Sequence, residues 1–157
     1  MSLHIVLYQP EIPANTGNIA RTCLATDTTL HLIHPLGFST EDKMLRRAGL
    51  DYWNKVKIEE YASIYDLYTL YPNGTYYYIE NFGTGHYTDF DYSNVEEDIF
   101  FVFGRETDGI PKSIIEGKEG KCLRIHMSDE VRSLNLSNTA AIIIYEALRQ
   151  QNFPHLT

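Results

Sequence analysis

Short apolar runs separated by turn-forming residues recur along the whole chain. Runs of this kind, rich in Ile, Leu, Val, Phe and Tyr and bounded by polar residues, are typical of strands that are buried on both faces of a sheet. We therefore predict strands at residues 3–8, 30–34, 55–61, 75–80, 98–104 and 121–127.

Segments with the apolar spacing of helices lie between these runs. They predict helices at residues 17–27, 42–48, 63–71, 111–116 and 137–151. Asn15, Thr16 or Asn18 could cap the first helix, and Ser137 alone could cap the last. Strands that alternate with helices predict an α/β domain with a mostly parallel sheet flanked by helices, in which ligands bind at the carboxyl ends of the strands.

The composition narrows the class of protein. The 157 residues fit a single domain, residues 1–157, and 43% hydrophobic with 22% charged residues is the composition of a globular chain rather than a disordered one. The amino terminus has no basic leader, and no window approaches the roughly 18 apolar residues of a membrane span. We expect a cytoplasmic protein that does not contact a membrane.

Two apolar features bear on the core and on a subunit interface. Cys23 and Cys122 lie far apart without the spacing of metal ligands or of a redox pair, so we expect two buried thiols and no metal site.

The last helix is apolar on nearly every side between Ala140 and Leu148. It must pack under the sheet or in a subunit interface, and the small size of the domain favours the interface.

Charge is distributed unevenly along the chain. A net charge of −8 argues against indiscriminate nucleic-acid binding. Residues 43–57, however, carry five basic side chains and one acidic one, Asp51, so this segment has a net charge of +4 and the rest of the chain −12. The segment is either a solvated helix face or an RNA contact, to which Tyr52 and Trp53 could add base stacking. Its basic residues are Lys43, Arg46, Arg47, Lys55 and Lys57.

Three loops after predicted strands have an unusual polar composition. The first, Asn15–Arg21, has neither the pattern of a phosphate loop nor metal spacing, and its arginine could reach a ligand from the helix. The second, Phe103–Pro111, has two glycines that let the backbone approach a ligand, and Glu106 in it either precedes a helix or fixes the neighbouring loops. The third, Met127–Asn138, carries many short-range donors and acceptors. Each loop alone could be a capped turn, but the combination is specific.

Taken in chain order, the three loops resemble the three motifs of the SPOUT superfamily of RNA methyltransferases. They read Asn-x5-Arg, then Phe-Gly-x-Glu-x-x-Gly-Ile-Pro, then Arg-Ser-Leu-Asn-Leu-Ser-Asn. The resemblance runs along the whole chain and is to the minimal, TrmL-type branch, which methylates the ribose of the anticodon wobble nucleotide of tRNA, cytidine or uridine 34. It implies an α/β fold with a deep trefoil knot in its carboxyl-terminal part, and a homodimer with each site near the partner chain.

The resemblance also implies S-adenosylmethionine as cofactor, S-adenosylhomocysteine as product, and no metal. Where the family commonly has Ile-Pro-Met in a cofactor loop, this chain has His126, which we expect to change the stiffness of the loop without abolishing binding. The segment NFGTGHY, residues 81–87, also departs from the family's usual sequence. Carried over onto this chain, the cofactor contacts are Ile79, Gly104, Ile125 and Ser133.

For catalysis, the resemblance places Arg21 at the ribose. A guanidinium with a pKa above about 12 is a poor base, so its expected role is to stabilise the developing alkoxide or to hold the adjacent phosphate. Asn15, Glu106 and Asn135 would orient Arg21 and the ribose. The segment 43–57 would grip the tRNA through Lys43, Arg46, Arg47, Tyr52 and Trp53.

Other functions stay open from the sequence. The same chemistry could act on another tRNA position or on ribosomal RNA, although larger relatives with such targets usually add an RNA-binding extension, which we do not expect here. A non-catalytic knotted module that binds cofactor or RNA would not need the full set of polar motif residues. A generic nucleotide-binding α/β domain is supported by fold analogy alone.

Overall fold

A seven-stranded parallel sheet forms the centre of the molecule in the computed structural model, which describes residues 2–157 except for the side chains of residues 49–51. The strand order is β3-β2-β1-β6-β4-β7-β5, and each recorded pairing is parallel. The sequence-based prediction of an α/β fold with a mostly parallel sheet is therefore confirmed. The strands are β1 (Leu3–Tyr8), β2 (Thr29–Ile33), β3 (Ile58–Tyr61), β4 (Thr75–Ile79), β5 (Gly85–His86), β6 (Ile99–Phe103) and β7 (Cys122–Arg124).

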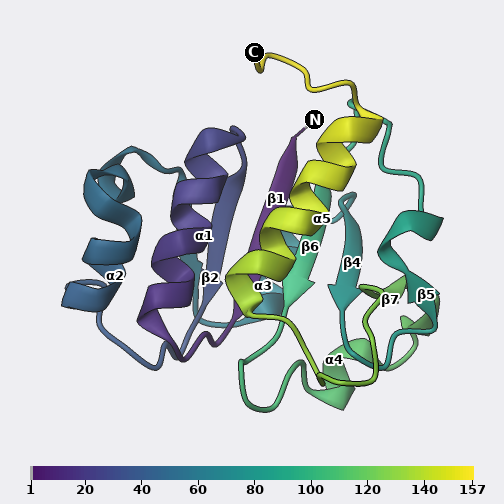
Figure 1. Ribbon diagram of the computed structural model, residues 1–157, viewed down its shortest axis with the longest axis horizontal. Helices are drawn as coiled ribbons and strands as arrows, with labels where there is room; N and C mark the ends of the chain where they lie inside the picture. The colour runs from purple at the N-terminus through teal and green to yellow at the C-terminus, as the bar shows by residue number, and fades with distance from the viewer. Residues whose placement is uncertain (1) are drawn as a thin grey trace.

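Helices cover both faces of this sheet (Figure 1). On one face, α1 (Pro13–Ala25), α2 (Lys43–Gly49) and α5 (Leu136–Gln150) pack over one hydrophobic cluster, and α5 lies across the sheet toward the viewer. On the other face, α3 (Ile64–Leu70) and α4 (Lys112–Ile115) pack over a second cluster. Burial on both faces explains why β1, β2 and β6 are mostly apolar runs, and all five residues of β6 are buried.

The first helix begins earlier than its polar residues suggest. Helix α1 starts at Pro13 with Ile12 at the N-cap, so the prediction that Asn15, Thr16 or Asn18 caps it is wrong. Proline suits the first helical position because its missing N–H would have no helical partner there and its φ is already helical. The polar side chains that resembled caps therefore lie within the helix, where the amide of Asn15 is available for a contact with another part of the chain.

The last helix is capped by Asn135 rather than by Ser137. The side-chain oxygen of Asn135 accepts hydrogen bonds from the backbone N–H groups of Ser137 and Asn138, which corrects the expected cap. Strand β5 has only two residues and no apolar pattern, so the sequence did not reveal it. Short 3-10 turns complete the chain at Leu50–Lys55, Tyr87–Asp89 and Glu119–Lys121.

Helix α5 buries one face against the sheet, at Ala140, Ile143, Ile144, Ala147 and Leu148. Its outer face is more accessible, and Tyr145 is 46% exposed. Packing under the sheet thus accounts for most of its apolar side, and a subunit interface on the outer face stays a prediction.

Other expectations concern the cysteines, the knot and membrane contact. Cys23 and Cys122 are both buried free thiols, as expected. The trefoil knot implied by the resemblance stays a prediction. Within residues 2–157, the helices include none with the length and apolar content needed to cross a membrane.

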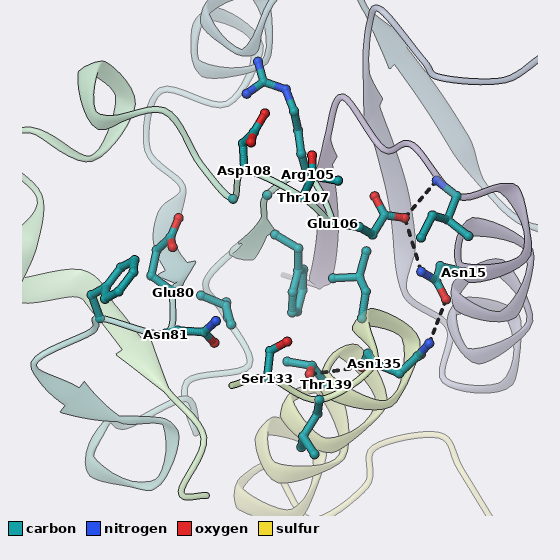
Figure 2. A pocket seen from close by; sticks show the side chains of 18 residues that line it. Asn15, Glu80, Asn81, Arg105, Glu106, Thr107, Asp108, Ser133, Asn135 and Thr139 are labelled. Carbon is teal, nitrogen blue, oxygen red and sulfur yellow. Dashed lines mark hydrogen bonds between the residues drawn. The ribbon is translucent and has the colours of Figure 1, made fainter. Parts of the chain in front are cut away.

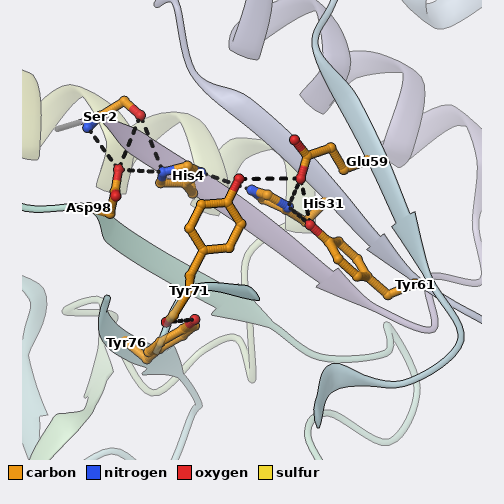
Figure 3. Close-up of polar contacts among 8 residues, drawn as sticks. All are labelled: Ser2, His4, His31, Glu59, Tyr61, Tyr71, Tyr76 and Asp98. Atoms are coloured by element: carbon orange, nitrogen blue, oxygen red, sulfur yellow. Dashed lines mark hydrogen bonds and ion pairs between the residues drawn. The ribbon is translucent and has the colours of Figure 1, made fainter. Parts of the chain in front are cut away.

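A buried polar cluster occupies the sheet face that α3 covers (Figure 3). His4 Nδ1 lies 2.8 Å from His31 Nε2, and His4 Nε2 lies 3.0 Å from Asp98 Oδ1. At the other end, His31 Nδ1 lies 3.0 Å from the Tyr61 hydroxyl, which donates to Glu59 Oε2 at 2.5 Å. The two buried imidazoles are thus joined to each other and flanked by two partly exposed carboxylates.

Candidate functional site

A pocket of about 460 Å³ lies where the carboxyl ends of β4 and β6 meet the first turns of α1 and α5 (Figure 2). Its walls are residues 79–82, 103–109, 133–136 and 139, together with Ile12 and Asn15. This is the edge of the sheet at which a parallel α/β fold binds ligands. Six residues predicted for the site line it: Asn15, Ile79, Gly104, Glu106, Ser133 and Asn135.

The loop after β6 closes on itself because two of its positions are glycine. Arg105 and Gly109 exchange backbone hydrogen bonds of 3.1 and 3.0 Å, and Gly109 has a φ of 70°, which suits glycine. A Cβ on Gly104 would lie 2.2 Å from the carbonyl carbon of Gly109. Alanine at residue 104 would therefore displace the loop that forms this wall of the pocket.

Glu106 fixes the first loop to the second. Its carboxylate accepts hydrogen bonds from the backbone N–H groups of Glu11 and Ile12, both at 2.9 Å, and from the Asn15 amide at 3.2 Å (Figure 2). Of the two roles left open by the sequence, the structure shows the one in which Glu106 fixes the neighbouring loops. The negative charge also faces the amino end of α1, where the helix dipole favours it.

Glu11 makes the reciprocal contact, which sequence reasoning missed. Its carboxylate accepts from the backbone N–H of Thr107 at 3.0 Å and from the Thr107 hydroxyl at 2.8 Å. These hydrogen bonds lower the pKa of Glu11. Each loop therefore binds a carboxylate of the other loop. Glu11 lies next to Pro10, and its local sequence gave no signal of this contact.

Asn15 also makes a hydrogen bond to the third loop. The Asn135 amide N–H donates to Asn15 Oδ1 at 3.1 Å, while Asn135 Oδ1 caps α5 (Figure 2). Glu106, Asn15 and Asn135 thus form one hydrogen-bonded chain across all three motifs. Because their polar atoms already bind one another, they are suited to position the loops rather than to react.

The charged side chains of the pocket are mostly acidic. Glu80 accepts from the backbone N–H of Ile110 at 2.7 Å, and burial raises the pKa of its carboxyl. Arg105 donates to Gln9 Oε1 at 2.9 Å through Nε. The lining residues that the structure describes include three carboxylates, those of Glu80, Glu106 and Asp108, and one guanidinium. This excess of negative charge favours a cationic ligand.

Two of the predicted catalytic and cofactor-binding residues lie outside this pocket. Arg21 is exposed on α1, with its guanidinium carbon 5.6 Å from the centre of the Tyr52 ring. Six residues of helix correspond to a rotation of about 600°, so Arg21 does not share the face of Asn15. Ile125 follows β7 and is buried in the core at 7% exposure. The chain on its own therefore brings neither side chain to the pocket walls.

His126, which follows Ile125, stacks on His86 with ring centroids 3.9 Å apart and an interplanar angle of 7°. This contact ties the loop after β7 to β5. The expected effect of His126 on the stiffness of this loop stays a prediction.

The basic segment 43–57 is only partly available to a ligand. Trp53 is 8% exposed in the hydrophobic core, so the prediction that it stacks on RNA bases is wrong. The Nε–H of Arg46 donates to the Thr40 carbonyl at 3.0 Å, and the Arg46 guanidinium lies over the Trp53 ring. Lys43 and Arg47 are exposed, and Tyr52 is partly buried. Four cations of the segment are exposed: Lys43, Arg47, Lys55 and Lys57.

Comparison with known proteins agrees with these motifs. The model of the SpoU rRNA Methylase family matches residues 2–145 of the chain. A Bacillus subtilis (strain 168) protein, named provisionally as a tRNA (cytidine(34)-2′-O)-methyltransferase, is 62% identical over 156 residues, which cover 99% of this chain and 98% of that protein.

Solved structures share the fold. One, described as giving structural insights into the 2-OH methylation of C/U34 on tRNA, superposes with a TM-score of 0.86 at 38% identity and covers 96% of this chain and 97% of that one. The SpoU methyltransferase AviRb from Streptomyces viridochromogenes, in complex with the cofactor AdoMet, has the same fold with a TM-score of 0.81 at 21% identity, over 96% of this chain and 58% of that one. The chain belongs to the SpoU methylase family.

Proposed function

We propose that this protein transfers a methyl group from S-adenosylmethionine to the ribose 2′-hydroxyl of the wobble nucleotide of tRNA, cytidine or uridine 34. The observation that carries the proposal is the convergence of the three motifs on one pocket through the chain of Glu106, Asn15 and Asn135. The names of close relatives support the same substrate. Such an enzyme would act in the cytoplasm, on free tRNA.

The pocket fits S-adenosylmethionine in size and charge. Ligand pockets commonly have volumes of about 300–1,000 Å³, and the acidic lining suits a ligand that carries a sulfonium and an ammonium group. Bound there, the cofactor supplies an electrophilic methyl group and leaves as S-adenosylhomocysteine. The backbone of Ile79, Gly104 and Ser133 would hold it, with Ile125 supporting the adjacent loop from the core.

The residues of this chain would act mainly by positioning. Methyl transfer needs the ribose oxygen in line with the methyl group, and fixing two reactants in place can supply about 7–11 kcal/mol of the barrier reduction. Glu106 and Glu11 fix the first two loops against each other, and Asn15 and Asn135 fix the third. In this proposal they are positioning residues that hold the ribose site open and rigid.

Arg21 would act in the pocket of a second copy of the chain. The proposed enzyme is a homodimer, and Arg21 is exposed and lies away from the pocket of its own chain. From the partner it would stabilise the developing alkoxide or hold the neighbouring phosphate.

Subunit complementation tests this placement of Arg21. Co-expressed Arg21→Ala and Glu106→Gln chains should recover about a quarter of wild-type activity, because half of the dimers would be mixed and each would have one intact site. Each variant alone should be nearly inactive. No recovery on mixing would mean that Arg21 acts within its own chain.

RNA binding would involve the exposed cations of the segment 43–57. We propose Lys43 and Arg47 as phosphate contacts and Tyr52 as a stacking contact, with Arg46 holding α2 in place. Arg47→Glu should weaken tRNA binding and reduce its salt dependence by a slope of about 1, with S-adenosylmethionine affinity unchanged. An unchanged salt slope would make the segment a solvated face.

Methyl transfer itself gives the test of the proposed function. The protein is incubated with labelled S-adenosylmethionine and with tRNA or ribosomal RNA from cells that lack this enzyme, and the methylated nucleoside is mapped by mass spectrometry. We expect a 2′-O-methyl group at nucleotide 34 of tRNA. Label in ribosomal RNA alone, the substrate in the family's description, would overturn the proposal.

A further inference from the structure

Phe82 is the most exposed large hydrophobic side chain among the described residues. It is 89% exposed, compared with 60% for Leu70 and 58% for Tyr65. Single exposed apolar residues are common on protein surfaces, so exposure alone assigns no role to Phe82. The turn that carries Phe82, its position at the pocket and the residues around it indicate a role.

The ring is attached to a tightly held turn. The backbone N–H of Glu80 donates to the Leu123 carbonyl at 3.0 Å, and the N–H of Gly83 donates to the Glu80 carbonyl at 3.2 Å. A Cβ on Gly83 would lie 2.7 Å from the Leu123 carbonyl carbon, so the turn packs closely against β7. The backbone that presents Phe82 is thus fixed before any ligand arrives, which reduces the entropy lost on binding.

The turn forms one rim of the candidate site. Asn81 and Phe82 line the same pocket as Gly104 and Ser133, at the carboxyl end of β4. Figure 2 shows Glu80 and Asn81 together on one side of this pocket, across from Glu106 and Asn15. A substrate that enters the pocket from solvent would therefore pass next to Phe82.

The surroundings of Phe82 favour a neutral, flat partner. Carboxylates of Glu80 and Asp108 line this pocket and would repel a phosphate. The other exposed residues of the turn, Asn81 and Thr84, are polar, which is unlike the apolar centre of a subunit interface. At 89% exposure the Phe82 ring keeps most of its surface open to solvent, where a partner larger than the pocket can reach it. A nucleobase stacks on an aromatic ring whatever its sequence identity.

We propose that Phe82 stacks on an unpaired nucleobase of the RNA substrate, at or next to the nucleotide that receives the methyl group. This rests on the proposed function and adds to it a recognition residue outside the motifs. This proposal gives the segment 81–87 a role in RNA binding. Gly83 lets the turn pack against β7, and Phe82 makes the stacking contact with the base.

The test uses an anticodon stem-loop RNA with the fluorescent base pyrrolocytidine at the target position or at a neighbouring unpaired position. Binding is titrated in the presence of S-adenosylhomocysteine. Phe82→Leu keeps an apolar side chain but removes the ring, and it should weaken RNA binding about 5- to 150-fold and abolish the quenching caused by stacking. Phe82→Trp should retain both. Tyr65→Leu, which removes an exposed ring outside the pocket, is the matched control and should change neither.

The outcomes separate this inference from the proposed function. If wild-type protein binds and methylates the RNA but Phe82→Leu behaves like Tyr65→Leu, the inference is wrong and the function stands. A loss of S-adenosylhomocysteine affinity with unchanged RNA affinity would assign the ring to the cofactor, and an altered sedimentation coefficient would assign it to a second copy of the chain. If the wild-type protein neither binds nor methylates the RNA, the proposed function fails, and the inference fails with it.

Discussion

The buried His4–His31 pair should make the stability of the fold depend on pH. The two side chains are 3% and 0% exposed, and burial lowers the pKa of His4. Burial, with a smaller contribution from His4, lowers the pKa of His31 to about 3. Glu59 lies 3.5 Å from His31 Nδ1, but the same Glu59 oxygen already accepts the Tyr61 hydroxyl. Both imidazoles are therefore neutral in the folded protein near pH 7.

The sign of the effect follows from where the protons bind. Histidine in an unfolded chain titrates near 6.5, so between about pH 7 and pH 5 the unfolded state gains protons that the folded state does not. Stability must then fall as the pH falls. For His31 alone, a pKa of about 3 in the folded state corresponds to a loss of about 2 kcal/mol at pH 5. His4 adds a loss of the same sign. The loss of about 2 kcal/mol from His31 alone compares with a typical stability of about 5–15 kcal/mol.

Urea unfolding followed by circular dichroism measures this loss at several pH values between about 7 and 5. His31→Gln removes the titrating group and keeps an amide beside His4. It should be less stable than wild type at neutral pH, but its free energy of unfolding should fall less on acidification, by about 2 kcal/mol at pH 5. His155→Gln changes an exposed histidine and should leave the wild-type pH dependence intact.

A charged pair would give the opposite sign. Four contacts join these side chains, and each needs one N–H or O–H proton: Asp98–His4, His4–His31, His31–Tyr61 and Tyr61–Glu59. Two neutral imidazoles and one phenol supply only three such protons. Protonation of one imidazole would supply the fourth proton. The hydrogen bond gained would contribute about 1.5–3 kcal/mol, which is less than the several kcal/mol that desolvation of the buried charge costs. Stability that rises as the pH falls from about 8 to 6, or an unchanged dependence in His31→Gln, would refute this reasoning.

Three further substitutions test the loops and the core. Glu106→Gln removes the charge from a carboxylate that accepts two backbone N–H groups at 2.9 Å, so the free energy of unfolding in urea should fall by about 2 kcal/mol and methyl transfer should fall with it. Gly104→Ala forces a Cβ to within 2.2 Å of Gly109, which should cost about 1–3 kcal/mol and abolish S-adenosylmethionine binding in calorimetry. Gly120→Ala, with no neighbour within 4 Å, should change neither. Trp53→Ala should lower the free energy of unfolding by about 3–5 kcal/mol without changing the salt dependence of RNA binding, because the ring is a core residue. A stable Trp53→Ala protein with weakened RNA binding would contradict its burial.

Strands β1, β2 and β6 could be predicted because they are buried on both faces, which leaves an apolar run in the sequence. The contacts between loops could not. Glu106 and Glu11 are 95 positions apart, and they meet because β1 pairs with β6, an adjacency that no local pattern encodes. For the same reason Asn15 looked like a helix cap, since its partner Glu106 lies in the loop after β6, far away in the sequence.

The basic segment shows a second limit of the sequence. Its alternation of cations and aromatic residues is the same whether a ring points into the core or toward solvent. The tertiary packing of α1 against α2 and the 3-10 turn Leu50–Lys55 decides this, and it buries Trp53 while leaving Arg47 exposed. Composition could identify the patch but could not say which of its members a ligand can reach.

The charge of the pocket bears on why the proposed enzyme would need two chains. Arg105 is the single cation among the described lining residues, and its guanidinium already binds Gln9. An acidic pocket suits a cationic cofactor, but it offers little to the phosphate and developing alkoxide of an RNA substrate, so that positive charge must come from outside the lining. If Arg21 of a second copy supplies it, dilution below the dimer dissociation constant should abolish methyl transfer. It should leave S-adenosylmethionine binding intact, because the residues proposed to hold the cofactor, Ile79, Gly104 and Ser133, belong to one chain. Parallel loss of both on dilution would mean that the dimer is needed to form the pocket itself.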